Sequence, residues 1–176
     1  MFLHNSLAGI SENFNSAELK FSEIPAKELC KNTDAYNALL ETLYAGAFAL
    51  SAESIGAMQV CFDMTIEYLK TREQFGKPIG SFQALQHRMV DVMIEIEQAK
   101  SAVMLAAGTY EGDKDTKYKN ISAAKNLVGR AGKLVAEECI QLHGGIAMTW
   151  EYNLHNYAKR LVCLLYTSPS PRDSVV

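Results

Sequence analysis

The sequence predicts an all-α fold: an antiparallel four-helix bundle with a short N-terminal β or extended segment. Over most of the 176 residues, apolar side chains recur at alternating steps of four and three, the spacing of one helix face. The breaks between these stretches contain glycine, proline and aspartate, residues that end helices. The expected helices span residues 34–71, 81–111, 116–142 and 150–165.

The first helix should begin near Asp34 and end near Thr71, because its periodic pattern stops there and Gly76 and Pro78 form a turn. Small residues crowd its middle, which is typical of a helix packed closely against another. Its recurring positions are Leu39, Leu43, Gly46, Leu50, Ala57, Cys61, Ile66 and Leu69.

The second helix has the clearest pattern, and we expect Ser81 to be its N-cap. Its seam is Leu85, Met89, Val92, Ile96, Ala99, Val103, Ala106 and Tyr110. A seam of this length predicts a long antiparallel bundle.

The third helix has an apolar inner face that runs from Ile121 to Cys139, and we expect Gly144 and Gly145 to end it. Glycine accepts the left-handed geometry of a helix C-terminus without strain. A shorter fourth helix should follow.

Both ends of the chain differ from the helical part. Residues 1–33 carry one weakly alternating stretch from Ala17 to Phe21, so we expect a strand remnant of a middle β domain and a linker. Residues 34–166 form the predicted helical domain. Residues 167–176 contain two prolines and no apolar period, so they are expected to be an unstructured, foreign tail.

Composition excludes several classes of function. The net charge of -3, from 17 basic and 20 acidic residues, is too balanced for a nucleic-acid-binding surface. No apolar run reaches the length of a membrane span, and no secretory signal is visible. The four cysteines have no metal-ligand or redox spacing, so we expect reduced thiols and no metal site.

The segment that joins the first two helices, from Arg72 to Gln83, carries groups suited to an anionic aromatic ligand. Arg72 can grip a pyrophosphate, and Phe75 can pack on an apolar edge. The following helix N-terminus offers free N–H groups. The alternative is a plain inter-helix turn in which Phe75 and Phe82 fill the core.

The segment from Gln141 to Tyr152 has a second such composition. Its glycine pair beside Gln141 and His143 would let backbone amides meet a ligand. The alternative is a helix C-cap followed by a loop, with His143 as an ordinary hydrogen-bonded residue.

The order of these two segments, their amino-acid sequences and the long helices between them resemble those of the acyl-CoA dehydrogenase family. The resemblance covers about Ala17 to Leu161 and is closest to the bacterial branch typified by the small subunit of pimeloyl-CoA dehydrogenase. The stretches typical of that branch are Tyr68 to Arg72, Phe82 to Arg88 and His155 to Arg160.

The resemblance implies an FAD-binding role for two groups of residues. The group expected at the FAD pyrophosphate is Arg72, Phe75 and Gln83. The group expected at the adenine and ribose end, across a dimer interface, is Gln141, Leu142, Gly144 and Gly145. The implied reaction is α,β-desaturation of an acyl-CoA thioester, with electrons passing to an electron-transfer flavoprotein.

The sequence departs from the family where a catalytic base is expected. One family position for the base falls near Ser168, inside the tail, and the other aligns with Gly46. We assign Glu53 to a packing pattern and Glu41 to a solvated face, so the catalytic base stays unknown. The third glycine of the usual Gly-Gly-x-Gly is Ala147, which is expected to tighten that turn.

The family implies a homo- or hetero-oligomer, a dimer or tetramer, and a location in the bacterial cytoplasm or, for a eukaryotic protein, the mitochondrial matrix. The main expectation is an enzyme fragment that is inactive alone, because the upstream domains are missing. The alternative is a non-catalytic partner subunit or oligomerisation module. A di-metal bundle would need Glu-x-x-His pairs, which the sequence lacks.

Overall fold

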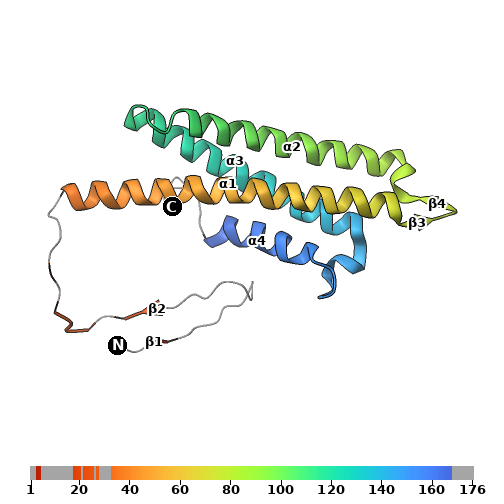
Figure 1. Ribbon diagram of the computed structural model, residues 1–176, viewed down its shortest axis with the longest axis horizontal. Helices are drawn as coiled ribbons and strands as arrows, with labels where there is room; N and C mark the ends of the chain where they lie inside the picture. Colours follow the sequence, from red (N-terminus) through yellow and green to blue (C-terminus); the bar gives the residue numbers. More distant parts are fainter. Residues whose placement is uncertain (1–2, 5–17, 21, 26, 28–32, 168–176) are drawn as a thin grey trace.

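A computed structural model describes residues 3–4, 18–20, 22–25, 27 and 33–167 (Figure 1). The helices are α1 (Thr33–Thr71), α2 (Gln83–Gly108), α3 (Lys114–His143) and α4 (Leu154–Thr167). The strands are β1 (Leu3–His4), β2 (Glu18–Leu19), β3 (Glu73–Gln74) and β4 (Lys77–Pro78). Two 3₁₀ helices, η1 (Ile79–Ser81) and η2 (Gly144–Met148), lie in the α1–α2 and α3–α4 connections.

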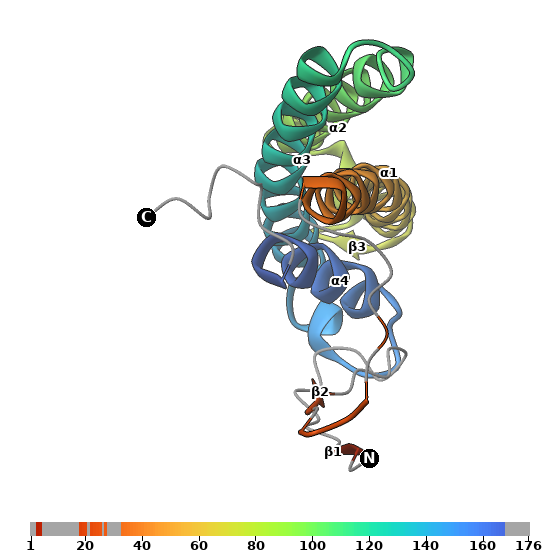
Figure 2. The same ribbon diagram turned by 90° about the vertical axis from the view of Figure 1, so that its left-hand side faces the viewer.

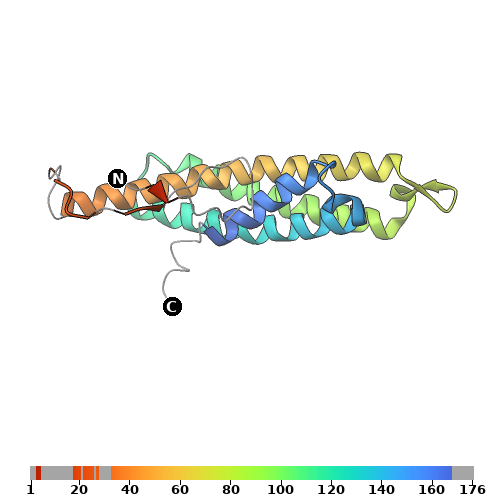
Figure 3. The same ribbon diagram turned by 90° about the horizontal axis from the view of Figure 1, so that it is seen from below.

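The four long helices form an antiparallel bundle, as predicted. Helix α3 contacts α1, α2 and α4, whereas α2 and α4 lie on opposite sides of the α1–α3 pair (Figure 2). Seen from below, the β3–β4 hairpin projects beyond the helices at one end of the bundle (Figure 3). The connection through η2 lies toward that same end (Figure 1).

The predicted helix boundaries agree with the structure to within a few residues. The first three helices are found within three residues of the expected limits. The fourth begins at Leu154, later than the expected residue 150, because residues 150–153 form turns before it.

The bundle core is built from the predicted seam. Met89, Val92 and Ile96 on α2 are all at most 4% exposed, as the four-three spacing requires. They pack toward α1, α3 and α4 in two clusters, one central and one at the hairpin end. The largest fully buried side chains are Met58, Ile121, Leu154, Val92, Val128 and Val135.

The prediction that Ser81 is the N-cap of α2 is wrong. Phe82 occupies the cap position, and no side chain caps the helix. The Ser81 hydroxyl instead donates to the Pro78 carbonyl at 2.7 Å, because Ser81 belongs to the η1 turn that precedes α2. In α3 the cap is Asp113, whose carboxylate accepts the Thr116 N–H.

The segments outside the bundle are described only in part. Strand β2 falls within the expected strand and pairs in antiparallel fashion with β1. Thr167 closes α4, and the rest of the predicted tail lies outside the described residues. The proposed domain limits after residues 33 and 166 stay predictions.

Helix α1 is the one helix in the described ranges that is long and apolar enough, by length and composition, to cross a membrane. A core helix of a bundle passes the same test. In this structure Glu41 and Glu53 on α1 pair with basic side chains of α3 and α4. Cys61, on its buried face, is a free thiol whose pKa burial raises to about 12.

Candidate functional site: two segments at one end of the bundle

The hairpin between α1 and α2 ends in a strained two-residue turn. Glu73 pairs with Pro78 and Gln74 with Lys77, so the turn residues are Phe75 and Gly76. Both have positive φ, 55° and 77°, the arrangement of a type I′ turn. A positive φ is uncommon for a non-glycine residue such as phenylalanine.

The Phe75 ring is 91% exposed, so it is not a core residue. Its nearest aromatic neighbour is Phe82, edge to face with the ring centroids 6.3 Å apart. Lys77 covers Phe82, with its ammonium 4.2 Å from the ring centroid. The hairpin therefore presents an aromatic ring at its tip, which excludes the simple alternative of a core-filling turn for Phe75.

Arg72 has a fixed backbone and a free side chain. Its N–H donates to the Tyr68 carbonyl and its carbonyl accepts the Ile79 N–H, both at 2.8 Å. In the part of the chain that the structure describes, its guanidinium has no ion-pair or hydrogen-bond partner. Gln83 is also exposed, in the uncapped first turn of α2. Free cationic and N–H groups therefore gather at this end.

The second segment begins at the end of α3. Gly144 has φ 69° and ψ -147°, and its N–H donates to the carbonyls of Ile140 and Gln141. The glycine pair is exposed, and a Cβ atom at either position would meet nothing within 4 Å. The glycine backbone is therefore exposed to solvent, and Gly144 makes the C-cap that the alternative interpretation requires, so the ligand role stays a prediction.

Two apolar members of the second segment face inward. Leu142 is 7% exposed and packs with Leu69 and Met89, so its side chain belongs to the core and only its backbone can face a ligand. Ala147, in the place of the third glycine, is fully buried in the central cluster. Gln141 is exposed.

The two segments share one small core. Leu69, Met89 and Leu142 are its buried residues, and Ile79 and Leu85 pack against them from the hairpin side. The end of α1, the start of α2 and the end of α3 thus meet in one cluster. The sequence had named the residues of both segments, but the packing that brings them to one end is visible only in the structure.

His143 is the polar centre of this end. It is 4% exposed, its Nδ1 lies 2.8 Å from the Cys139 carbonyl, and its Nε2 lies 3.1 Å from the Tyr152 hydroxyl. The Tyr68 ring stacks on it at 4.5 Å between centroids. Burial lowers the pKa of His143. The reading of His143 as a hydrogen-bonded residue is confirmed, whereas its contact with Tyr68 could not be read from spacing.

A second buried histidine lies at the start of α4. His155 is 4% exposed, and neither ring nitrogen has a hydrogen-bond partner among the described residues. The exposed Trp150 ring meets it edge to face, and Lys159 covers Trp150. Burial, together with the charge of Lys159, lowers the pKa of His155.

An apolar groove of about 320 Å³ runs beside the hairpin between α1 and α2. Phe62, Ile66 and Leu69 line one side, and Met89 and Met93 line the other.

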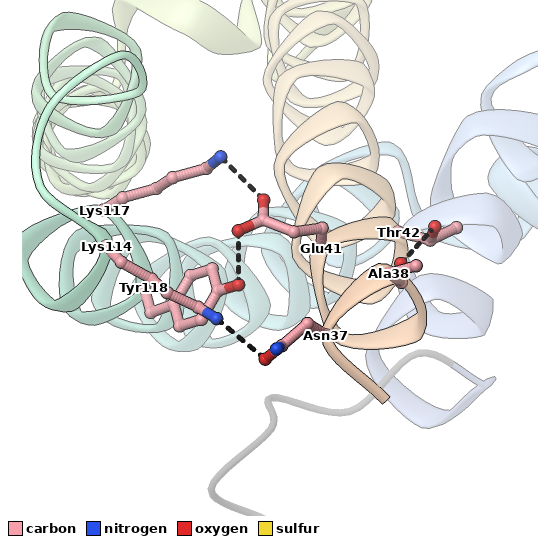
Figure 4. Close-up of polar contacts among 7 residues, drawn as sticks. All are labelled: Asn37, Ala38, Glu41, Thr42, Lys114, Lys117 and Tyr118. Carbon is pink, nitrogen blue, oxygen red and sulfur yellow. Dashed lines mark hydrogen bonds and ion pairs between the residues drawn. The ribbon is translucent and has the colours of Figure 1, made fainter. Parts of the chain in front are cut away.

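Neither dismissed carboxylate is free to act as a base. Glu41 keeps a 43% exposed side chain, in line with its expected place on a solvated face, but it also accepts hydrogen bonds from Lys117 at 2.8 Å and Tyr118 at 2.6 Å (Figure 4). These bonds hold the pKa of Glu41 below its usual range, with the bond from Lys117 as the largest cause. Glu53 accepts two hydrogen bonds from Arg160, at 2.7 and 3.1 Å. In the described part of the chain, no cluster of three or more acidic, histidine or cysteine side chains could hold a metal ion.

Residues 36–164 match the family model described as acyl-CoA dehydrogenase, C-terminal domain. The chain belongs to the acyl-CoA dehydrogenase family. The resemblance seen in the two segments is thereby confirmed, and so is the assignment of the helical bundle to the C-terminal domain of such enzymes.

Curated relatives in the acyl-CoA dehydrogenase family match only with part of their length. Acyl-CoA dehydrogenase IpdE2 of Mycobacterium tuberculosis is 44% identical over 127 residues, which are 72% of this chain and 38% of that protein. The short/branched chain specific acyl-CoA dehydrogenase of rat mitochondria is 32% identical over 146 residues, which are 81% of this chain and 34% of that protein. The chain thus spans a little over a third of the length of these enzymes.

Solved acyl-CoA dehydrogenase structures share the bundle. The glutaryl-coenzyme A dehydrogenase glutaryl-CoA complex has a TM-score of 0.75 at 25% identity, over 81% of this chain and 36% of that one. The ChsE4-ChsE5 complex of M. tuberculosis has a TM-score of 0.72 at 26% identity, over 81% of this chain and 38% of that one.

Proposed function

We propose that this chain is the C-terminal portion of an FAD-dependent acyl-CoA dehydrogenase and that its hairpin end contributes contacts to the cofactor. The observation that carries the proposal is the convergence of an unpaired Arg72 guanidinium and an open Gly144–Gly145 backbone on one end of the bundle. Family membership supports the chemistry, because the relatives carry the name of this enzyme.

The residues present fit the ADP half of FAD. The Arg72 guanidinium would hold the pyrophosphate through paired hydrogen bonds, and the uncapped N-terminus of α2 beside Gln83 favours negative charge. Phe75 would supply an apolar ring face. These residues bind and orient but do not react.

The other half of this surface would hold the adenosine end. Gln141 offers an exposed amide, and Gly144 and Gly145 allow a ring or ribose to approach the backbone where a Cβ would otherwise stand. Leu142 would act through its backbone only, because its side chain is buried. FAD, when bound, supplies the hydride acceptor for α,β-desaturation.

The wider context of the enzyme is also part of the proposal. Acyl-CoA would be the substrate, and an electron-transfer flavoprotein would receive the electrons. A bacterial protein would work in the cytoplasm and a eukaryotic one in the mitochondrial matrix. Exposed apolar side chains on α1 and α2, among them Leu39, Leu43, Met104 and Leu105, support a homo- or hetero-oligomer, a dimer or tetramer.

The second candidate is a non-catalytic partner subunit or oligomerisation module. The observation that favours it is Gly46, which stands at a family position for the base, while Glu41 and Glu53 are held by α3 and α4. One of the similar solved structures is a complex of ChsE4 with ChsE5. Such a module would still bind the ADP half of FAD through the same residues.

Titration of the chain with FAD, followed by the change in flavin fluorescence, tests the proposed binding. The Arg72→Ala variant should weaken binding by roughly 10- to 100-fold, because hydrogen bonds to a charged group contribute about 1.5–3 kcal/mol. Arg130→Ala is the matched control, an exposed arginine on α3 away from the hairpin. Equal loss in the two variants, or no binding by the parent chain, would refute the proposed contact.

A further inference from the structure

The hydrogen bonds of His143 determine which ring nitrogen carries the proton. Nδ1 lies 2.8 Å from the Cys139 carbonyl, and a carbonyl oxygen can only accept, so Nδ1–H is the donor. A neutral ring then leaves Nε2 bare, and the Tyr152 hydroxyl, 3.1 Å away, donates to it. In its neutral form the imidazole is therefore the Nδ1–H tautomer, with both nitrogens bonded.

One face of this imidazole contacts the helix turn that carries Arg72. The Tyr68 ring lies on it with a centroid distance of 4.5 Å and an interplanar angle of 26°. The carbonyl of the same tyrosine accepts the Arg72 N–H at 2.8 Å, and the Arg72 carbonyl in turn accepts the Ile79 N–H. His143 thus contacts the residue, Tyr68, whose carbonyl is hydrogen-bonded to the backbone of Arg72.

The Nε2 atom of the imidazole closes the glycine-containing loop. His143 is the last residue of α3, and Gly144 follows it directly. Tyr152 lies beyond η2, so its bond to Nε2 ties the two ends of the intervening loop together. The Tyr152 ring also meets the Tyr68 ring edge to face at 6.4 Å. The three rings therefore form one cluster between the two segments.

We propose that His143 is a positioning residue that holds the Arg72 turn and the Gly144–Gly145 loop in one fixed arrangement through Tyr68 and Tyr152. The coupling of the two segments is a property of the fold and stands by itself. Its consequence for the cofactor rests on the proposed function: a ligand that bridges both segments meets a prearranged surface and loses less freedom on binding.

Protonation of the ring would disrupt this arrangement. An added proton on Nε2 would reverse its bond with Tyr152, so that the hydroxyl would have to rotate and accept, and the positive charge would be buried. The titratable groups that face the ring are Tyr68 of α1, Tyr152 of the loop and Cys139 of α3, and phenols and thiols carry no compensating charge near neutral pH. Burial accordingly lowers the pKa of His143, which the carbonyls of Cys139 and Met64 oppose only in part.

Amide hydrogen exchange in three variants tests the coupling. Tyr152→Phe removes only the hydroxyl. His143→Asn keeps an amide donor near the position of Nδ1, and His143→Gln keeps an acceptor near that of Nε2. Tyr157→Phe is the control, a tyrosine on the exposed face of α4. The reporters are the N–H of Ile79 in the hairpin and of Thr149 after η2, and Thr109 N–H at the far end of α2 is the reference.

Tyr152→Phe should speed exchange at Thr149 by about three- to tenfold, the effect of one lost neutral hydrogen bond. His143→Asn should speed exchange at both Thr149 and Ile79, whereas His143→Gln should restore part of the protection at Thr149. Thr109 and the Tyr157→Phe control should be unchanged. A ¹H–¹⁵N correlation spectrum of the imidazole near neutral pH should show that Nε2 of His143 carries no proton.

Three results would overturn the proposal. The first is unchanged amide exchange at both Thr149 and Ile79 in Tyr152→Phe and in His143→Asn. The second is an equal acceleration of exchange at Thr109 in these variants, which indicates global destabilisation only. The third is a spectrum in which Nε2 of His143 carries a proton. The exchange experiment needs no cofactor, so a parent chain that fails to bind FAD refutes the proposed function and leaves this test intact. In a chain that binds FAD, the affinity of Tyr152→Phe should fall along with its protection at Thr149.

Discussion

Replacing Leu142 by alanine tests the packing that joins the two segments. The side chain is 7% exposed and contacts the buried Leu69 and Met89, with half-buried neighbours on the hairpin side. Buried Leu→Ala changes cost about 2–5 kcal/mol, depending on how far the cavity collapses. Because Met89 is flexible and borders the open groove, we expect the lower part of that range, about 2–3 kcal/mol.

Urea unfolding followed by far-ultraviolet circular dichroism measures this cost. The expected result is a lower midpoint with an unchanged slope, together with a decrease in Tm of roughly 2–8 °C for each kcal/mol. Leu105→Ala is the matched control, because this leucine of α2 is 58% exposed and its truncation should stay within about 0.5 kcal/mol. If the two variants lost the same stability, the buried position of Leu142 would be wrong.

Three further predictions concern the backbone, pH dependence and activity. Gly144→Ala should cost about 1–3 kcal/mol in urea unfolding, since its φ of 69° with ψ of -147° disfavours any side chain, whereas Gly145→Ala should cost much less. The pKa values of His143 and His155 lie below the ordinary 6.5, so the unfolded chain binds these protons more readily. Their contribution to the free energy of unfolding should be complete above pH 6.5 and lost as the pH falls below it, with a slope of at most about 1.4 kcal/mol per pH unit for each histidine. A free energy of unfolding that stays constant between about pH 7 and pH 5 would contradict this. The 176-residue chain alone, given FAD and an electron-accepting dye, should show no acyl-CoA-dependent reduction, because both family positions for the base lack a carboxylate; turnover lost in Arg72→Ala would contradict it.

Helix existence and the core faces could be predicted because they depend on local periodicity. The side chains of the four-three seam from Leu85 to Tyr110 are buried or half-buried in the structure. Gly144 correctly predicted the end of α3. Local chemistry also suggested that the cysteines are reduced thiols, and the structure describes Cys61 and Cys139 as free thiols.

The errors arose where a neighbouring element changes the role of a residue. Ser81 has the side chain of an N-cap, but a hairpin and a 3₁₀ turn precede α2 and move the cap to Phe82. The side chain of Glu41 is 43% exposed, as its sequence context indicates, but its hydrogen bonds with Lys117 and Tyr118 of α3 could not be read from the sequence.

The candidate site could be predicted only as separate pieces. Its exposed residues were named from motif and resemblance, but their roles toward FAD stay predictions. Tyr68 and His143 are far apart in sequence, so their stacking depends on the packing of α1 against α3. The strain at Phe75 was equally invisible, because nothing in its side chain indicates a positive φ.

The most direct test of the account is an amide-resolved NMR titration of the chain with ADP, the part of FAD that the two segments are proposed to hold. The account predicts chemical-shift changes from Arg72 to Gln83 and at Gly144 and Gly145 that saturate together with a single dissociation constant. Arg72→Ala should weaken the response of both segments, and Arg130→Ala should leave it unchanged. Shifts confined to one segment, different dissociation constants for the two, or no saturable change at either would contradict the claim that they form one binding surface.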